Sequence, residues 1–168
     1  FLAMASESSK SNPSAKTLVS SAEMLALDNE SVSLVIANML LHWCDVSAVF
    51  SEVSRILKVG GSFFFSTLGP DSLLELRLAW AQADTLPHVH DFVDMHDLGD
   101  ALIKAGLAEP VLDTDRLCVT YDDYMNLIVD LRKMGAINAR QDRRKTWTGK
   151  TRYKRAMDEY EGFSNQDR

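Results

Sequence analysis

The stretch VSLVIANMLLHWCDVSAVFSEVSRILKVGGSFFFSTL, residues 32–68, decides the fold that we predict for this chain. It begins and ends with a short apolar run, at residues 32–41 and 62–68. Strands that are buried on both faces, as in a parallel sheet covered by helices, have this composition. We therefore expect two buried strands here.

The residues between these two runs predict a helix. Apolar side chains recur at helical spacing from Val46 to Leu57, and Asp45 precedes them as a candidate N-cap. Gly60-Gly61 follows as a candidate helix stop. A strand, a helix and a strand joined by short connections predict a right-handed βαβ unit with parallel strands.

The rest of the chain extends this α/β pattern, with a helical insertion near its C-terminal end. Turn residues, capping residues and apolar spacing predict further strands and helices on both sides of the βαβ unit. The strands are expected at residues 17–21 and 110–121, and the helices at 71–84, 94–106, 122–134 and 148–160. Asp71 is the expected N-cap of the first of these helices. Open α/β sheets bind ligands beyond the carboxyl ends of their strands, which directs attention to residues 38–44 and 66–71.

Composition excludes several classes of protein. The 168 residues suffice for one domain, and 46% of them are hydrophobic and 25% charged, as in ordinary globular chains. No apolar run is long enough to span a membrane. Two cysteines predict reduced thiols and a cytoplasmic location. The histidines at positions 88, 90 and 96 lack a fourth ligand at metal-binding spacing, so we predict no metal site.

Charge is distributed unevenly. Residues 132–155 carry a charge of +9, whereas the rest of the chain carries −15. This basic stretch is either a solvated pair of helices or a docking face for an acidic partner. We do not expect it to bind nucleic acid, because only Trp147 and Tyr153 are available there for base stacking.

Several motifs resemble a known family. Residues 28–44 and the segment VSRILKVGG, residues 53–61, resemble the fourth strand and the following helix exit of class I S-adenosylmethionine-dependent methyltransferases. Four later blocks are similar to the biotin-synthesis malonyl-acyl-carrier-protein O-methyltransferases: FSTLGPDSL (65–73), PHVHDF (87–92), DLGDAL (97–102) and LRKMGAIN (131–138). The resemblance covers about residues 17–160. A complex I assembly factor that is a hydroxylase on the methyltransferase fold shares some of these blocks, and a non-catalytic interaction module is a third alternative.

The resemblance implies a cofactor, a partner and site residues. The cofactor is S-adenosylmethionine, and the partner is an acyl-carrier protein whose malonyl carboxylate is methylated. The chain is then one partial methyltransferase domain, residues 1–168, with substrate-side helices at 69–109 and a basic helical cap at 121–168. The residues implied for the cofactor are Ser21, Ala22, Asn38, Leu40 and Leu41; candidate catalytic residues are His42 and His88; candidates for the substrate carboxylate are Arg77 and Arg132; and candidates for partner docking are Arg140, Arg143, Arg144 and Lys145. For each of these residues an ordinary structural or surface role is the alternative.

The chain also departs from the family pattern. None of its eight glycines precedes residue 60, so the glycine-rich turn that cradles the cofactor is missing, and Ser21 stands where relatives have an aspartate. The first two strands and the last strand of the family sheet are missing as well. We therefore expect an incomplete Rossmann-like sheet whose unpaired edges permit a homo-oligomer.

Overall fold

The computed structural model describes residues 16–133, 138 and 142–164. The chain divides into two compact units, one formed by residues up to Thr67 with Met95–Leu112, the other by Leu68–Asp94 with residues from Asp113 onward. The segment 69–109, expected to form one group of helices, is thus divided between the units.

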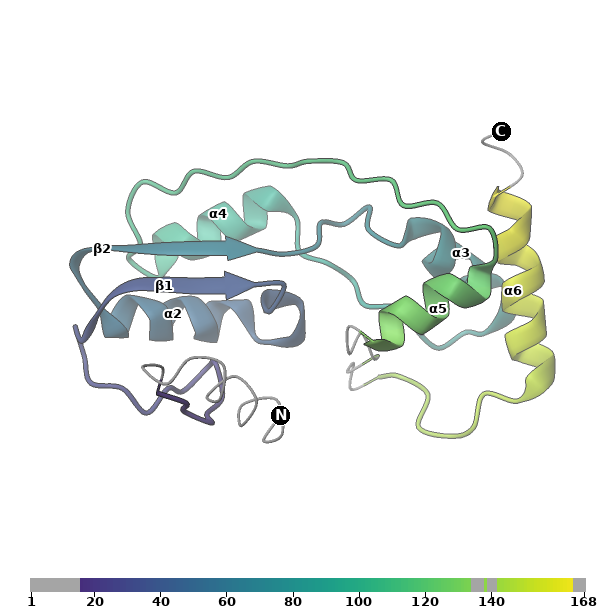
Figure 1. Cartoon of the computed structure of the whole chain (residues 1–168), viewed down its shortest axis with the longest axis horizontal. Helices are drawn as coiled ribbons and strands as arrows, with labels where there is room; N and C mark the ends of the chain where they lie inside the picture. Colours follow the sequence, from purple (N-terminus) through teal and green to yellow (C-terminus); the bar gives the residue numbers. More distant parts are fainter. Residues whose placement is uncertain (1–15, 134–137, 139–141, 165–168) are drawn as a thin grey trace. The chain divides into compact units, whose positions relative to one another are not determined.

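The predicted βαβ unit is the centre of the first unit (Figure 1). Strand β1 (Val32–Asn38) and strand β2 (Leu57–Ser66) pair in parallel, and helix α2 (Val46–Ile56) connects them after the short 3-10 helix η1 (Leu41–Trp43). The Asp45 side chain accepts a hydrogen bond of 3.0 Å from the backbone N–H of Ala48, so the predicted N-cap of α2 is confirmed.

The predicted role of Gly60-Gly61 as a helix stop is wrong. Helix α2 ends at Ile56, and both glycines lie inside β2, where the register shifts between Val32 and Leu34 of the partner strand. Gly60 has a φ of 77°, and a Cβ on Gly61 would lie 2.9 Å from the Lys58 carbonyl oxygen. The two glycines therefore allow a bulge that a side chain would obstruct.

One face of the two-stranded sheet is covered. Phe50 and Val53 of α2 pack with Leu98 and Leu102 of helix α4 (Met95–Lys104) in a core against which Phe63 and Phe65 of β2 lie. The Phe50 ring centroid lies 5.6 Å from that of Phe65. Helix α4 ends as predicted, with Gly106 in the left-handed region at a φ of 85°.

The prediction that both strands are buried on two faces is wrong for the described part of the chain. The side chains on the opposite face are largely exposed, at 51% for Leu34, 69% for Ile36 and 63% for Phe64. Each strand also has one edge without a β partner among the described residues. The described residues form an α/β fold with a two-stranded parallel sheet, and the absence of particular strands of the family fold stays a prediction.

The second unit is helical. It contains α3 (Leu74–Ala83), α5 (Tyr124–Lys133) and α6 (Lys150–Ser164), and α3 packs against α6. One cluster of its buried residues consists of Leu76, Val89, Ala156 and Met157, with Trp80, Tyr124, Ile128, Tyr153 and Tyr160 packed around them. The helices predicted near the C-terminal end are therefore present.

Two predicted strands and one predicted N-cap are wrong. Residues 17–21 form no strand but only an isolated antiparallel bridge between Ser21 and Met24. Residues 110–121 form no regular structure, and Leu117 is 86% exposed. Helix α3 begins at Leu74 rather than after Asp71, whose carboxylate instead pairs with Arg116 at 2.8 Å.

Candidate functional site

The carboxyl ends of β1 and β2 are joined by a polar cluster. Asn38 and Ser66 are register partners at these ends. The Ser66 hydroxyl donates to Asn38 Oδ1 at 2.6 Å and accepts the Met39 N–H at 3.1 Å, and the Met39 N–H also bonds the Ser66 carbonyl at 2.9 Å. Met39 has a φ of 51°, so the chain turns sharply here. Ser66 was not among the predicted site residues; its register with Asn38 is the signal that identifies it.

The residues after this turn have different surroundings. Leu41 is 1% exposed and packs in the first core, so its side chain faces the core rather than an open surface. Leu40 and His42 are half-buried, and the His42 ring centroid lies 4.8 Å from that of Trp43. Of the two leucines implied for the cofactor, only Leu40 therefore has surface to offer.

The turn at Ser21–Glu23 is tied to the N-terminal end of α2. Ser21 is exposed, and its hydroxyl donates to Glu23 Oε2 at 3.1 Å. Glu23 Oε1 accepts the backbone N–H of Asp45 at 2.8 Å, and Ala22 packs against the first core. Because the N-terminal end of the helix in a βαβ unit adjoins the carboxyl end of the preceding strand, Ser21 and Ala22 lie at the same edge of the sheet as Asn38.

Cys44 lies beside this turn but is not an activated nucleophile. Burial, and then the negative charge of Glu23, raise the pKa of the Cys44 thiol above its ordinary value. Since the thiolate is the nucleophilic form, a raised pKa keeps this cysteine unreactive at neutral pH. An unreactive, half-buried thiol of this kind acts as a small apolar side chain.

His88 belongs to a clasp in the second unit, which we name for its two ion-paired members, Asp84 and Arg144. The buried Asp84 carboxylate accepts two hydrogen bonds of 2.7 Å from the Arg144 guanidinium, and His88 Nε2 lies 2.8 Å from Asp84 Oδ2. The His88 ring stacks on Trp80 with centroids 3.8 Å apart. The hydrogen bonds from Arg144 are the main reason that the pKa of Asp84 lies well below its ordinary range; burial opposes them, and His88 adds to them.

The Asp84–Arg144 clasp bears on two sequence-based roles. His88 is held by an aspartate and by an indole ring, and its catalytic role stays a prediction. Arg144 was predicted to dock a partner, but its side chain is only 17% exposed and its charge is neutralised internally. Asp84 was not among the predicted site residues, and because it and His88 lie beyond the end of α3, no helical spacing links them in the sequence.

The two candidates for the substrate carboxylate differ in their surroundings. The Arg77 guanidinium donates to the Pro70 carbonyl at 2.6 Å and to the His90 carbonyl at 3.5 Å, and no carboxylate neutralises it among the described residues. It therefore retains its attraction for an anion while its position is fixed. Arg132 is exposed in the last turn of α5.

The basic surface retains several exposed side chains. Arg143 and Lys145 are exposed, and Trp147 between this segment and α6 is 90% exposed. Arg140 lies outside the described residues. Exposed basic residues continue onto the first turns of α6, at Lys150, Arg152, Lys154 and Arg155.

Two kinds of feature are absent from the described residues: a metal-binding cluster and a membrane-spanning helix. In the described part of the chain, no three or more histidine, cysteine, aspartate or glutamate side chains gather as a metal site would require. Within the same residues, no helix combines the length and the apolar character needed to cross a membrane.

Comparisons with known proteins agree with the resemblance. Residues 1–65 match the family model described as a methyltransferase domain. The chain is 45% identical over 140 residues to a malonyl-[acyl-carrier protein] O-methyltransferase of Nitrosospira multiformis, covering 83% of this chain and 46% of that protein. It is 42% identical over 155 residues to malonyl-[acyl-carrier protein] O-methyltransferase 1 of Coxiella burnetii, covering 92% of this chain and 54% of that protein.

A third relative, from Gallionella capsiferriformans and of the same name, is 43% identical over 140 residues, covering 83% of this chain and 48% of that protein. The chain thus spans about half the length of the curated relatives that it matches. The sequence-based resemblance to class I methyltransferases of this type is confirmed.

Proposed function

We propose that this chain, a relative of the malonyl-acyl-carrier-protein O-methyltransferases, is the part of such an enzyme that contributes one side of the cofactor site and the substrate-binding helices. The observation that carries the proposal is identity of 42–45% over 83–92% of this chain to proteins of that name. The reaction is methylation of the free carboxyl of malonyl-acyl-carrier protein in biotin precursor synthesis.

The described residues fit one side of S-adenosylmethionine. Asn38 and Ser21 offer exposed hydrogen-bonding groups at the carboxyl edge of the sheet, and Ala22 and Leu40 add apolar surface. Such an edge suits the hydroxyl, amine and ring groups of a nucleoside. When bound, the cofactor supplies a methyl group already activated by its sulfonium.

The protein's own share of the chemistry is positioning. A malonyl carboxylate is ionised at neutral pH and needs no general base to attack a methyl group. What it needs is a fixed orientation and the exclusion of water. Arg77, fixed by two carbonyl groups and without a neutralising carboxylate, is the better of the two candidates to hold that carboxylate, and Arg132 is the second.

The basic surface is proposed to bind the acidic carrier protein. Charges of opposite sign accelerate association in a salt-dependent manner. Because the Arg144 side chain is only 17% exposed, we assign the docking charge to the exposed side chains of Arg143, Lys145 and the start of α6 rather than to Arg144. A cytoplasmic location and a homo-oligomer through the free strand edges remain parts of this proposal.

Calorimetric titration with S-adenosylmethionine tests the cofactor assignment, using this chain and a longer chain extended upstream. Binding by the longer chain supports the proposal, and methylated malonyl-carrier protein in a product analysis completes it. Binding without that product favours the hydroxylase-type assembly factor instead. Absence of binding by both chains refutes the enzyme and favours a non-catalytic interaction module.

Docking is tested by the association rate with malonyl-carrier protein at low and high salt. Arg143→Glu combined with Lys145→Glu should slow association, and the difference should shrink as salt screens the charges. Lys104→Glu makes the same kind of charge change on α4 of the other unit and serves as the control. If the double variant and the control associate equally fast, the docking surface lies elsewhere.

A further inference from the structure

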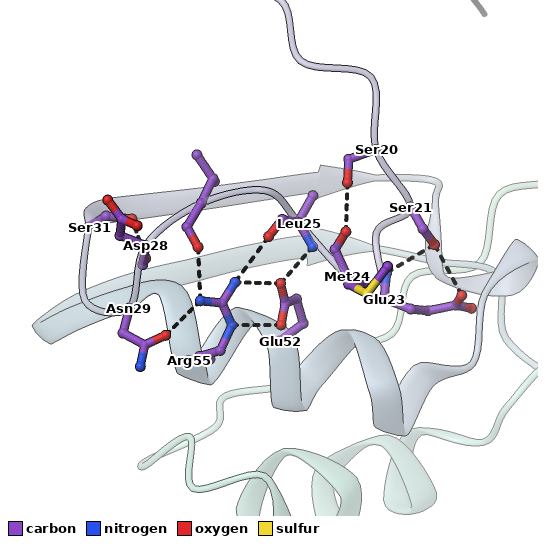
Figure 2. A network of polar contacts seen from close by, with 11 residues as sticks. Ser20, Ser21, Glu23, Met24, Leu25, Asp28, Asn29, Ser31, Glu52 and Arg55 are labelled. Carbon is purple, nitrogen blue, oxygen red and sulfur yellow. Dashed lines mark hydrogen bonds and ion pairs between the residues drawn. The ribbon is translucent and has the colours of Figure 1, made fainter.

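A segment without regular secondary structure, residues 20–29, is held along helix α2 at two places, and we name it the α2 strap. Figure 2 shows the contacts that Glu52 and Arg55 of α2 make with its end and the hydrogen bond between Ser21 and Glu23 near its beginning. Near its beginning, Glu23 also accepts the backbone N–H of Asp45. The strap precedes β1 and contains Ser21 and Ala22.

The contact near the end of the α2 strap is dense. Arg55 makes two hydrogen bonds to the Glu52 carboxylate, of 2.9 and 2.7 Å, in a fork-to-fork pair. The same guanidinium donates to the carbonyl groups of Leu27 and Leu25, at 2.8 and 3.1 Å, and to Asn29 Oδ1 at 2.6 Å. All the directions of this planar group are thereby used.

Glu52 completes this contact from the other side. Its Oε1 accepts the backbone N–H of Leu25 at 2.6 Å, so both the N–H and the carbonyl of Leu25 are held by the pair. The Glu52 side chain is 11% exposed and that of Arg55 is 34% exposed. This is a structured, partly buried anchor rather than a loose surface ion pair.

The contact near the beginning of the strap sets the position of a turn. Glu23 accepts the Asp45 N–H at the N-terminal end of α2, while Ser21 donates to the same carboxylate. The Met24 N–H donates to the Ser21 carbonyl at 3.2 Å and closes the turn. The result is that the turn Ser21–Glu23 lies at the carboxyl edge of the sheet, where an open α/β sheet binds its ligand.

We propose that Glu23, Glu52 and Arg55 are positioning residues that hold the α2 strap so that the turn Ser21–Glu23 forms one wall of the cofactor site before the cofactor binds. This inference rests on the proposed function for the identity of the ligand. Ordering this wall in advance removes an entropic cost from binding. None of the three residues needs to touch the cofactor.

Amide hydrogen exchange of this chain tests the first half of the proposal without any ligand. Arg55→Ala should accelerate exchange at Met24 and Leu25 by about tenfold or more, because both lie in the segment that the guanidinium holds. Amides in the β1–β2 ladder should change little. Lys58→Ala is the matched control, because Lys58 is exposed three residues further along and its side chain has no such contacts. Unchanged exchange at Met24 and Leu25 overturns the proposal.

Affinity for S-adenosylhomocysteine, measured with the upstream-extended chain, tests the second half. Arg55→Ala should weaken binding by about tenfold, Arg55→Lys should weaken it less, and Lys58→Ala should leave it unchanged. Faster exchange in Arg55→Ala with unaltered affinity overturns the positioning role. A wild-type extended chain that binds no S-adenosylhomocysteine refutes the proposed function itself, whereas the exchange data still decide whether Arg55 holds the strap.

Discussion

The Asp84–Arg144 clasp yields a quantitative prediction about stability. Its two side chains are 2% and 17% exposed and are joined by two hydrogen bonds of 2.7 Å. Removing one partner of a buried pair costs about 3–5 kcal/mol, because the other charge is left uncompensated. Arg144 retains some contact with water, so we expect Asp84→Asn to lower the free energy of unfolding by about 3 kcal/mol, at the lower end of that range.

Urea unfolding followed by Trp80 fluorescence is the assay, since this indole stacks on His88 within the same cluster. Trp43→Phe and Trp147→Phe provide a background in which Trp80 alone reports. A double-mutant cycle with Arg144→Gln isolates the coupling, because once Asp84 is gone the loss of Arg144 should cost much less than it does alone.

The chain offers a matched control in an exposed pair of the same type. Asp71 and Arg116 are 2.8 Å apart, but their side chains are 70% and 90% exposed. Solvent screening limits such a pair to about 1 kcal/mol or less. Additive effects in the Asp84–Arg144 cycle, or a loss no greater than that of Asp71→Asn, would refute the reasoning that burial makes this pair stabilising.

Three further predictions concern other parts of the chain. The hydrogen bonds from Arg55 lower the pKa of Glu52 to about 2, so the contribution of Glu52 to stability is complete above pH 4.5 and is lost as the pH falls toward 2. Glu52→Gln should remove this part of the pH dependence of the free energy of unfolding in urea, and an unchanged pH profile would contradict the assignment. Gly61→Ala should destabilise the chain by about 1–3 kcal/mol in thermal unfolding, whereas Gly69→Ala, which meets no neighbour, should be nearly neutral; equal effects would rule out the steric argument. Size-exclusion chromatography should show that the chain associates as its concentration rises. The double variant Ile36→Thr and Phe64→Thr, which removes two exposed apolar side chains of the sheet, should reduce this association. A monomer at all concentrations would count against association through the exposed face of the sheet.

The sequence predicted those elements whose determinants are local. Helix α2 has an apolar stripe that packs into the core and an N-cap that acts within one turn. Both features could be predicted from the order of neighbouring residues in the sequence. The strands β1 and β2 were found because their apolar runs flank that helix. Gly106 likewise ends α4 through its own backbone conformation.

Two local signals failed, the helix stop at Gly60-Gly61 and the N-cap at Asp71, and the other failures concern predictions that depend on distant partners. Alternating apolar residues at 110–121 satisfied the pattern of a strand, but a strand also needs a neighbour to take up its hydrogen bonds, and the described chain has none there. The same limit applies to β1 and β2, whose composition indicates two covered faces although only one is covered here. The composition of a strand indicates which of its faces can be buried, but it does not show whether other elements cover those faces.

The two arginine–carboxylate pairs, one in each unit, show the same difference between local and distant determinants. Glu52 and Arg55 are three residues apart on one helix, so their pairing is accessible from spacing alone. Asp84 and Arg144 are sixty residues apart, and nothing in the basic run distinguishes Arg144 from Arg143 beside it. The charge of +9 counted along residues 132–155 is therefore larger than the positive charge available to bind an acidic partner, because Asp84 neutralises Arg144. The proposed docking surface is defined by exposure, which is why the exposed Arg143 and Lys145, and not the largely buried Arg144, are the residues whose charge should set the association rate.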